Sequence, residues 1–120
     1  MITVGIIGPL TPRGNGNHAV EYLQNVSAGI AAATELIQHG FAPFCPHVDF
    51  QYVLMYPLIS EAELKAISHE WIRRCDCVLA LPGWRESEGA KAEAALCELA
   101  QIPVFESIGK IIEWRKRREA

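Results

Sequence analysis

Short apolar runs alternate with longer helical patterns along this chain, and no other feature constrains its fold as much. Four runs have the length and apolar character of strands, at residues 2–7, 41–45, 76–82 and 103–105. Strands that alternate with helices in this way pair in parallel, and the helices cover both faces of the sheet. We therefore predict an α/β fold: a doubly wound, Rossmann-like parallel sheet of four to five strands with helices on both faces.

The length of the chain limits its domain organisation. With 120 residues, half of them apolar, it can bury one core and is too short for two ordinary domains. We predict a single domain over residues 1–120. No apolar run approaches the roughly 20 residues of a membrane span, and Met1 leads directly into the first strand-like run. We expect a soluble, cytoplasmic protein with no membrane partner.

Cysteine usage indicates neither a disulfide scaffold nor a metal site. The four cysteines lie within or beside apolar segments and show no CxxC spacing, so we expect reduced, mostly buried thiols. Pairing Cys45 with His47, or Cys75 with Cys77, gives no standard zinc spacing. We expect neither a metal nor a cofactor.

The net charge of −3 conceals a basic C-terminal segment. Residues 110–120 hold five of the eleven basic residues and two of the fourteen acidic ones. The remainder of the chain therefore has six basic and twelve acidic residues, a net charge of −6. Such cations can form a nucleic-acid patch, but cations in the last turn of a helix also complement its dipole and keep it soluble. Because the rest of the chain is acidic, we favour the second interpretation and expect no nucleic-acid partner.

Two of the predicted helices have recognisable ends. The first follows a loop over residues 8–18 and runs to about His39, where Gly40 ends it. The second begins after Ser60, which forms a capping box with Glu63. The side chains expected on its buried side are Leu64, Ile67 and Trp71.

The segment between the second strand and the Ser60 helix is predicted to be irregular, over residues 46–59. It carries several large side chains: Phe50, Tyr52, Met55 and Tyr56. An irregular segment of this length usually has a function. We interpret it as a lid or a wall of a substrate site.

Two loops fit the ligand site of such a fold. In a doubly wound sheet, ligands bind beyond the carboxyl ends of the strands, where the strand order reverses. Residues 8–18 follow the first strand and residues 83–87 follow the third. Neither loop has the spacing of a dinucleotide fingerprint or a P-loop. The candidate binding residues of the first loop are Gly8, Pro9, Thr11 and His18.

The second loop adds two candidate binding residues. Ser87 can cap a helix that begins near Glu88, and its hydroxyl with the free N–H groups there would suit a phosphate or a ribose hydroxyl; a structural cap alone is an equal alternative. Trp84 can stack on a nucleobase or cover the edge of the core. Asp76, at the opposite end of the third strand, is expected to be a structural cap.

Glu93 is the most informative single residue. An apolar stripe at helical spacing is predicted from Ala92, Ala95, Leu96 and Leu99. Glu93 lies at the edge of this stripe, with Lys91 and Glu98 on the opposite face, and no Lys or Arg stands three or four positions away to pair with it. A partly buried carboxylate without a local partner is a functional candidate. Ser87 is less than two turns away, so a ligand held at the helix start would meet Glu93.

Two blocks of the sequence belong together: a first strand that ends in GPLT and the later block CDCVLALPGWRESEGAKAEAALCELAQIPVF. With this combination the chain resembles the nucleoside 2-deoxyribosyltransferase superfamily, particularly its small bacterial and phage branch, over about residues 2–106. The most specific element is Ser-x-Gly-x-x-x-Glu, here Ser87, Gly89 and Glu93. In active members the Glu attacks the sugar C1′ and the Ser helps to hold the sugar or its 5′-phosphate. The resemblance implies that Glu93 is the catalytic nucleophile and that Ser87 and Gly89 bind substrate.

The chain departs from the hydrolases of that family at one position. They tend to carry an acidic residue three positions before the Trp-Ile pair of the preceding helix, where it places or protonates the leaving base. Here the pair is Trp71-Ile72, and the position holds Ser68 with His69 beside it. Asp49 and His47, in the segment before this helix, are the candidates to take the role of the missing acid.

Two functions therefore stay open. The first is an enzyme that cleaves or transfers at the N-glycosidic bond of a (deoxy)nucleoside or nucleoside 5′-monophosphate through Glu93. The second is a non-catalytic nucleotide-binding or sensing module on the same fold. In both, the partner is a small-molecule nucleoside or nucleotide. Family members usually associate through helices beside the site, so the resemblance also implies a homo-oligomer, dimer or larger.

Overall fold

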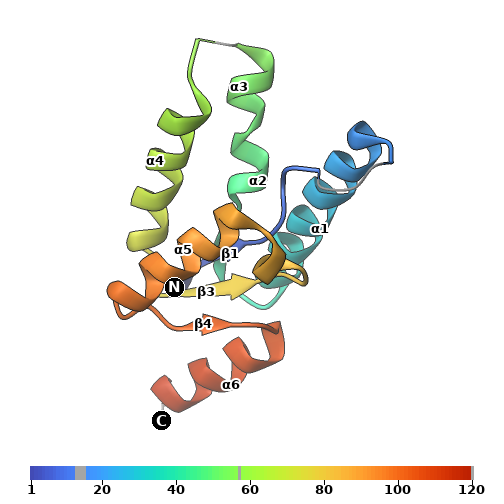
Figure 1. Cartoon of the computed structure of the whole chain (residues 1–120). Helices are drawn as coiled ribbons and strands as arrows, with labels where there is room; N and C mark the ends of the chain where they lie inside the picture. The colour runs from blue at the N-terminus through green and yellow to red at the C-terminus, as the bar shows by residue number, and fades with distance from the viewer. Residues whose placement is uncertain (13–15, 57, 120) are drawn as a thin grey trace.

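A computed structural model describes residues 1–12, 16–56 and 58–119 of the chain (Figure 1). Its centre is a four-stranded sheet in the order β2-β1-β3-β4, in which all neighbouring strands run parallel. The strands are β1 (Thr3–Ile7), β2 (Ala42–Phe44), β3 (Cys77–Ala80) and β4 (Val104–Phe105). The predicted parallel α/β sheet is thereby confirmed, with four strands.

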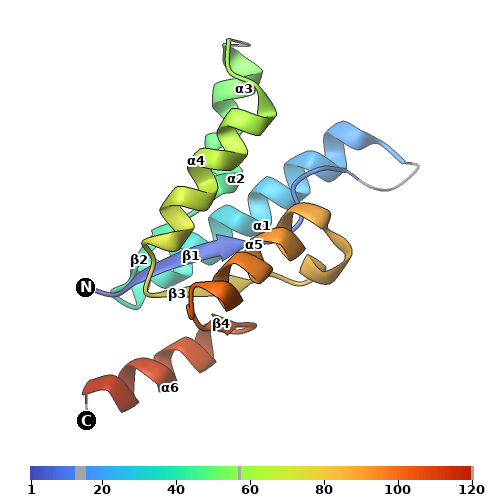
Figure 2. The same ribbon diagram turned by 60° about the vertical axis from the view of Figure 1, so that its left-hand side comes forward.

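Helices cover both faces of this sheet. The helices on one face are α1 (His18–Gln38) and α6 (Ile108–Glu119), and those on the other are α4 (Glu61–Arg73) and α5 (Glu88–Leu99). Figures 1 and 2 show α4 and α6 on opposite sides of the strands. None of the described helices combines the length and the apolar character that a membrane span requires.

The central strand β3 contributes to both cores, because successive side chains of a strand point to opposite faces. Cys77 and Leu79 pack with α1 and α6, whereas Val78 and Ala80 pack with α4 and α5. All four side chains are buried. Cover on both faces explains the nearly continuous apolar character of this strand in the sequence.

The segment predicted to be irregular is helical, so that prediction is wrong. It forms α2 (Pro46–Asp49) and α3 (Gln51–Met55). Pro46 begins α2, where its fixed φ favours a helix and its missing N–H is not needed. Helices of four and five residues are too short to show a readable apolar period. In both views α3 and the start of α4 project away from the sheet (Figures 1 and 2).

The cap of α4 is confirmed. The Glu63 backbone N–H donates to the Ser60 hydroxyl and the Ser60 N–H donates to the Glu63 carboxylate, both at 3.1 Å. This reciprocal pair satisfies two of the N–H groups that every helix start leaves unbonded. It fixes the first residue of a helix that reaches from the projecting end to the sheet.

The buried face of α4 differs from the predicted one. Its buried residues are Leu64, Ser68 and Ile72, each four positions after the last. Ile67 and Trp71, which were expected on this face, are 48% and 54% exposed. The Trp71 ring instead packs against Phe44, with 6.2 Å between the ring centroids.

The buried face of α5 also differs from the predicted one. Its buried residues are Ala90 and Cys97, which lie two turns apart and face the β3 side of the core. Three residues of the predicted stripe are exposed: Ala92, Ala95 and Leu99. Small side chains at the contact let the helix lie close to the sheet. Close packing therefore decides which side of α5 faces the sheet, and the size of its apolar side chains does not. This orientation turns Glu93 toward the inside instead of the rim.

Asp76 is the structural cap that the sequence predicts. Its Oδ2 accepts hydrogen bonds from the Thr3 N–H at 2.8 Å and from the Thr3 hydroxyl at 3.1 Å. The Asp76 N–H in turn lies 2.9 Å from Thr3 Oγ1. These bonds join the starts of β1 and β3, at the edge of the sheet opposite the carboxyl ends of the strands.

Two cations of the basic segment take part in packing. The Arg115 guanidinium lies 4.2 Å from the Phe41 ring centroid and donates to the His39 carbonyl at 2.7 Å. Arg118 lies 4.6 Å from the Trp114 ring centroid. The Arg115 contacts attach α6 to the end of α1, whereas the Arg118 contact lies within α6. Both are structural uses of cations near a helix C-terminus.

The thiols are unpaired, and three of the four are buried, as predicted: Cys75, Cys77 and Cys97. Burial raises the pKa of the Cys75 thiol to about 11 and that of Cys77 to about 12. Thiols with such pKa values are protonated at neutral pH and therefore poor nucleophiles.

Candidate active site

A cavity of about 430 Å³ lies where the loops after β1 and β3 meet the starts of α4 and α5. The order β2-β1-β3-β4 reverses direction between β1 and β3, and both loops leave from the carboxyl ends of these two strands. This is the place where open α/β sheets bind ligands. The volume falls within the roughly 300–1,000 Å³ of small-molecule sites.

Glu93 lines this cavity from the second turn of α5. Burial raises the pKa of its carboxyl from 4.5 to about 7, and the Lys65 ammonium acts in the opposite direction. In the described part of the chain no hydrogen bond to this carboxylate is found. A carboxyl group whose proton affinity is tuned to neutral pH, without a structural partner, is suited to chemistry.

Ser87 and Gly89 line the cavity at the start of the same helix. The Ser87 hydroxyl caps α5 by accepting from the Ala90 N–H at 3.3 Å, so the predicted cap is confirmed. A Cβ atom added to Gly89 would meet no atom within 4 Å. The space beside Gly89 is therefore open, and a ligand there lies next to the helix start and within reach of Glu93.

Gly8 and Thr11 line the cavity from the loop after β1. A Cβ atom at Gly8 would come within 2.8 Å of the Leu81 Cβ, so only glycine lets the two loops approach this closely. Asn25 of α1 donates to the Leu10 carbonyl at 3.1 Å and holds the loop from outside. Residues 13–15 of this loop lie outside the described residues.

Residues on α4 complete the cavity, and sequence reasoning missed two of them. Ser68 and His69 line it, as their place just before the Trp-Ile pair suggests. The two residues that were missed, Glu61 and Lys65, line it as well. The His69 Nε2 atom is buried and has no hydrogen-bond partner among the described residues. The signal for Glu61 and Lys65 was available, since residues 61, 65 and 69 are four apart and share one helix face.

Four candidate binding residues do not line this cavity: Pro9, His18, Asp49 and Trp84. Pro9 supports the loop indirectly, because its carbonyl lies 3.1 Å from Nε2 of the buried His47. His18 lies exposed at the start of α1. Asp49 ends α2, where burial raises the pKa of its carboxyl.

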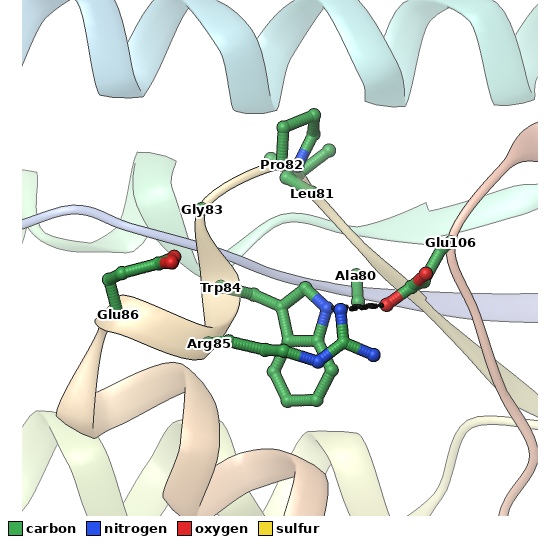
Figure 3. A pocket seen from close by; sticks show the side chains of 8 residues that line it. All are labelled: Ala80, Leu81, Pro82, Gly83, Trp84, Arg85, Glu86 and Glu106. Carbon is green, nitrogen blue, oxygen red and sulfur yellow. Dashed lines mark hydrogen bonds and ion pairs between the residues drawn. The ribbon is translucent and has the colours of Figure 1, made fainter.

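Trp84 points toward a different part of the surface. Its indole N–H donates to the Glu106 carboxylate at 2.9 Å, and the Arg85 guanidinium lies 4.6 Å from the ring centroid. Figure 3 shows Arg85 over this ring and paired with Glu106. The indole therefore joins the loop after β3 to the end of β4. Of the two predicted uses, the structure favours cover of the core edge.

No group of three or more His, Cys, Asp or Glu side chains in the described ranges is arranged to hold a metal ion. The polar side chains at the cavity are instead carboxylates, three hydroxyls, an imidazole and one ammonium group. Such a set can bind hydroxyl groups, stabilise positive charge and supply a carboxylate nucleophile.

Comparison with known proteins gives one family. The family model of DUF4406, a domain of unknown function, matches residues 14–106 of the chain. No curated protein matches the chain. The matched region contains Ser87, Gly89 and Glu93 and the cavity side of α4, and it begins after Gly8 and Thr11.

Proposed function

The chain belongs to the DUF4406 family of domains of unknown function, and from that premise we propose an activity based on the site itself. We propose that the protein cleaves or transfers at the N-glycosidic bond of a nucleoside or nucleoside 5′-monophosphate, with Glu93 as the nucleophile. The observation that carries this proposal is a half-buried carboxyl group with a pKa of about 7 in a cavity at the sheet's switch point.

The chemistry requires few groups. Breaking an N-glycosidic bond passes through an oxocarbenium-like sugar, which a nearby carboxylate stabilises and can trap as a glycosyl-enzyme ester. A Glu93 oxygen forms a bond to C1′ as the bond to the base breaks, and the electron pair leaves with the base. Water then releases a free sugar, whereas a second base gives transfer.

The placement of the other cavity residues supports the same assignment. The Ser87 hydroxyl and the open space at Gly89 lie beside the helix start, and Gly8 and Thr11 line the same cavity from the loop after β1. A pentose held between them would lie against Glu93. The resemblance to nucleoside 2-deoxyribosyltransferases, which rests on Ser87, Gly89 and Glu93, gives these residues the same roles.

A second candidate function is a module that binds a nucleoside or nucleotide without turnover. Ser68 favours it, because this buried residue lines the cavity with a hydroxyl group. At the equivalent position, hydrolases of the nucleoside 2-deoxyribosyltransferase superfamily tend to carry an acid that acts on the leaving base. A serine hydroxyl does not donate a proton at neutral pH. A substrate whose base needs a proton would then bind and remain intact.

The test is release of free base, followed by chromatography after incubation with nucleosides, deoxynucleosides and their 5′-monophosphates. We expect base from the wild type and from Glu98→Ala, which removes an exposed carboxylate on the same helix. We expect none from Glu93→Ala. Binding without base release by the wild type favours the second function. Equal release by Glu93→Ala contradicts the proposed nucleophile.

A further inference from the structure

The cavity has a strongly unequal charge. Among the described residues that line it, one is a cation, Lys65, and the acids are Glu61, Glu86, Glu88 and Glu93, of which Glu88 is paired with Lys91 at 2.9 Å. Lys65 lies close enough to Glu93 to lower the pKa of that carboxyl, so its charge already acts on the nucleophile. An anionic ligand therefore meets repulsion from several sides, and a cationic ligand meets attraction.

The helix start beside Ser87 is poorly suited to a phosphate. A phosphate at such a place uses free backbone N–H groups. Here the Ala90 N–H is already bonded to the Ser87 hydroxyl, and acidic residues stand on both sides of Ser87 in the chain: Glu86, and Glu88, which pairs with Lys91 at 2.9 Å. Figure 3 shows the Glu86 carboxylate lying apart from the Arg85 guanidinium, which pairs with Glu106 at 2.7 Å. Acidic residues already stand at the positive end of the helix dipole, with Glu88 in the first turn and Glu86 just before it, and their charge disfavours a phosphate there.

The α4 wall is poorly suited to proton donation. Ser68 offers a hydroxyl, and burial, together with Lys65 and Arg73, lowers the pKa of His69, so its imidazole is neutral at pH 7. The buried, unbonded His69 Nε2 can hydrogen-bond to a base but is a weak acid in this state. A neutral base departing as an anion is not assisted here. A base that already carries a positive charge departs as a neutral molecule and needs no proton.

We propose that the cavity takes a nucleoside that has no 5′-phosphate and whose base carries a fixed positive charge, such as an N7-alkylated purine or a pyridinium ring. This inference rests on the proposed function and specifies its substrate class. Glu93 forms a bond to C1′, the bond from C1′ to the cationic nitrogen breaks, and its electron pair neutralises that nitrogen. Water then adds to C1′, Glu93 leaves as a carboxylate, and the surplus proton goes to solvent.

The test compares guanosine with 7-methylguanosine, which differ by one methyl group and one positive charge at pH 6, and adds 7-methylguanosine 5′-monophosphate. Ribosides and 2-deoxyribosides are both used. Each kcat/KM is divided by the rate of spontaneous cleavage, because alkylated nucleosides are intrinsically labile. After this correction we expect 7-methylguanosine to exceed both guanosine and its own monophosphate by at least tenfold.

Binding gives a readout that does not depend on lability. With Glu93→Gln, equilibrium dialysis is expected to show tighter binding of 7-methylguanosine than of guanosine, and added salt is expected to reduce the difference. Glu61→Gln and Glu86→Gln should each lower this preference about twofold, the size expected for one charge roughly 8 Å away in water. Glu98→Gln, outside the cavity, should leave the preference unchanged.

Two results would overturn the inference in different ways. Glu93-dependent cleavage with no preference for the cation, or with preference for the monophosphate, overturns the inference and leaves the proposed function standing. Absence of cleavage of every compound by the wild type overturns both.

Discussion

Glu93 is ionised in water at neutral pH, but its place in the fold favours the neutral form. Burial raises the pKa of its carboxyl from 4.5 to about 7. The folded state therefore holds the proton more tightly than the unfolded state does. The stability associated with the protonated carboxyl is fully present below about pH 4.5 and is lost as the pH rises through about 7.

Glu93→Gln should therefore stabilise the protein at high pH. The shift corresponds to a free-energy cost of about 3 kcal/mol for the ionised carboxyl at pH 8, which an amide does not incur. Urea denaturation at pH 8 should show a gain of that order in the free energy of unfolding, and at pH 4 almost none. Glu98→Gln, on the exposed side of α5, should show neither. A gain that is the same at both pH values would mean that packing, not ionisation, is responsible.

The same ionisation sets the pH dependence of activity. Only the carboxylate attacks C1′, so kcat/KM for a cleaved nucleoside should rise with pH and level off above about 7. Initial rates between pH 5 and 9, at substrate concentrations well below KM, measure this directly. A midpoint near 4.5, the ordinary value of a glutamate, would show that the nucleophile is not buried during catalysis.

At the scale of helices and strands, the sequence predicts ends better than faces. The caps at Ser60 and Ser87 and the bond from Asp76 were predicted correctly, because each depends on a few neighbouring residues or on one strand end. The inner faces of α4 and α5 were predicted only in part, since Leu64 is buried and Leu96 packs against the core, but the other expected residues are exposed. Their buried residues include Ser68 and Ala90, and a search for the largest apolar side chains does not find small buried residues.

The candidate site shows the same division. Gly8, Thr11, Ser87, Gly89 and Glu93 do line one cavity, because the strand order alone brings these loops and this helix start together. Other candidates failed to reach it because loop composition does not tell which way a side chain points. Trp84 is the clearest example, since its direction depends on Arg85 and on Glu106, 22 residues away in sequence.

Asp76→Ala tests the junction of β1 and β3. It removes two hydrogen bonds to Thr3 at the sheet edge opposite the cavity. We expect a loss of about 1–3 kcal/mol in the free energy of unfolding and unchanged kcat/KM below the melting range. Denaturation and initial rates on the same preparation measure both. Asp76→Asn, which keeps one acceptor, should recover part of the stability. A change in KM would show that the two ends of the sheet are coupled.

At the scale of the whole molecule, the projecting helices make the shape elongated, 46 Å along its long axis and 25 and 23 Å across. The apolar side chains exposed on α3 and just after it form a group that we call the α3 patch: Tyr52, Leu54, Met55, Tyr56 and Leu58. Leu58 is 89% exposed and Tyr56 72%. Single exposed apolar residues are normal, but a contiguous group of large ones marks an interaction surface.

We predict that the protein forms a homo-oligomer through the α3 patch. A helix of only five residues, such as α3, is barely stable by itself. Contact with a second copy of the chain would bury its exposed apolar side chains and explain why so many of them lie there. Sedimentation across the micromolar range should show a dimer or a larger assembly. Met55→Glu should shift it toward the monomer, because association would bury a charge without a partner. The matched control is Leu99→Glu, which should leave the assembly intact. Leu99 is also a large apolar residue, is 86% exposed and lies at the far end of α5. If Leu99→Glu dissociates the assembly and Met55→Glu does not, the copies meet through α5 and the α3 patch is not the interface between them.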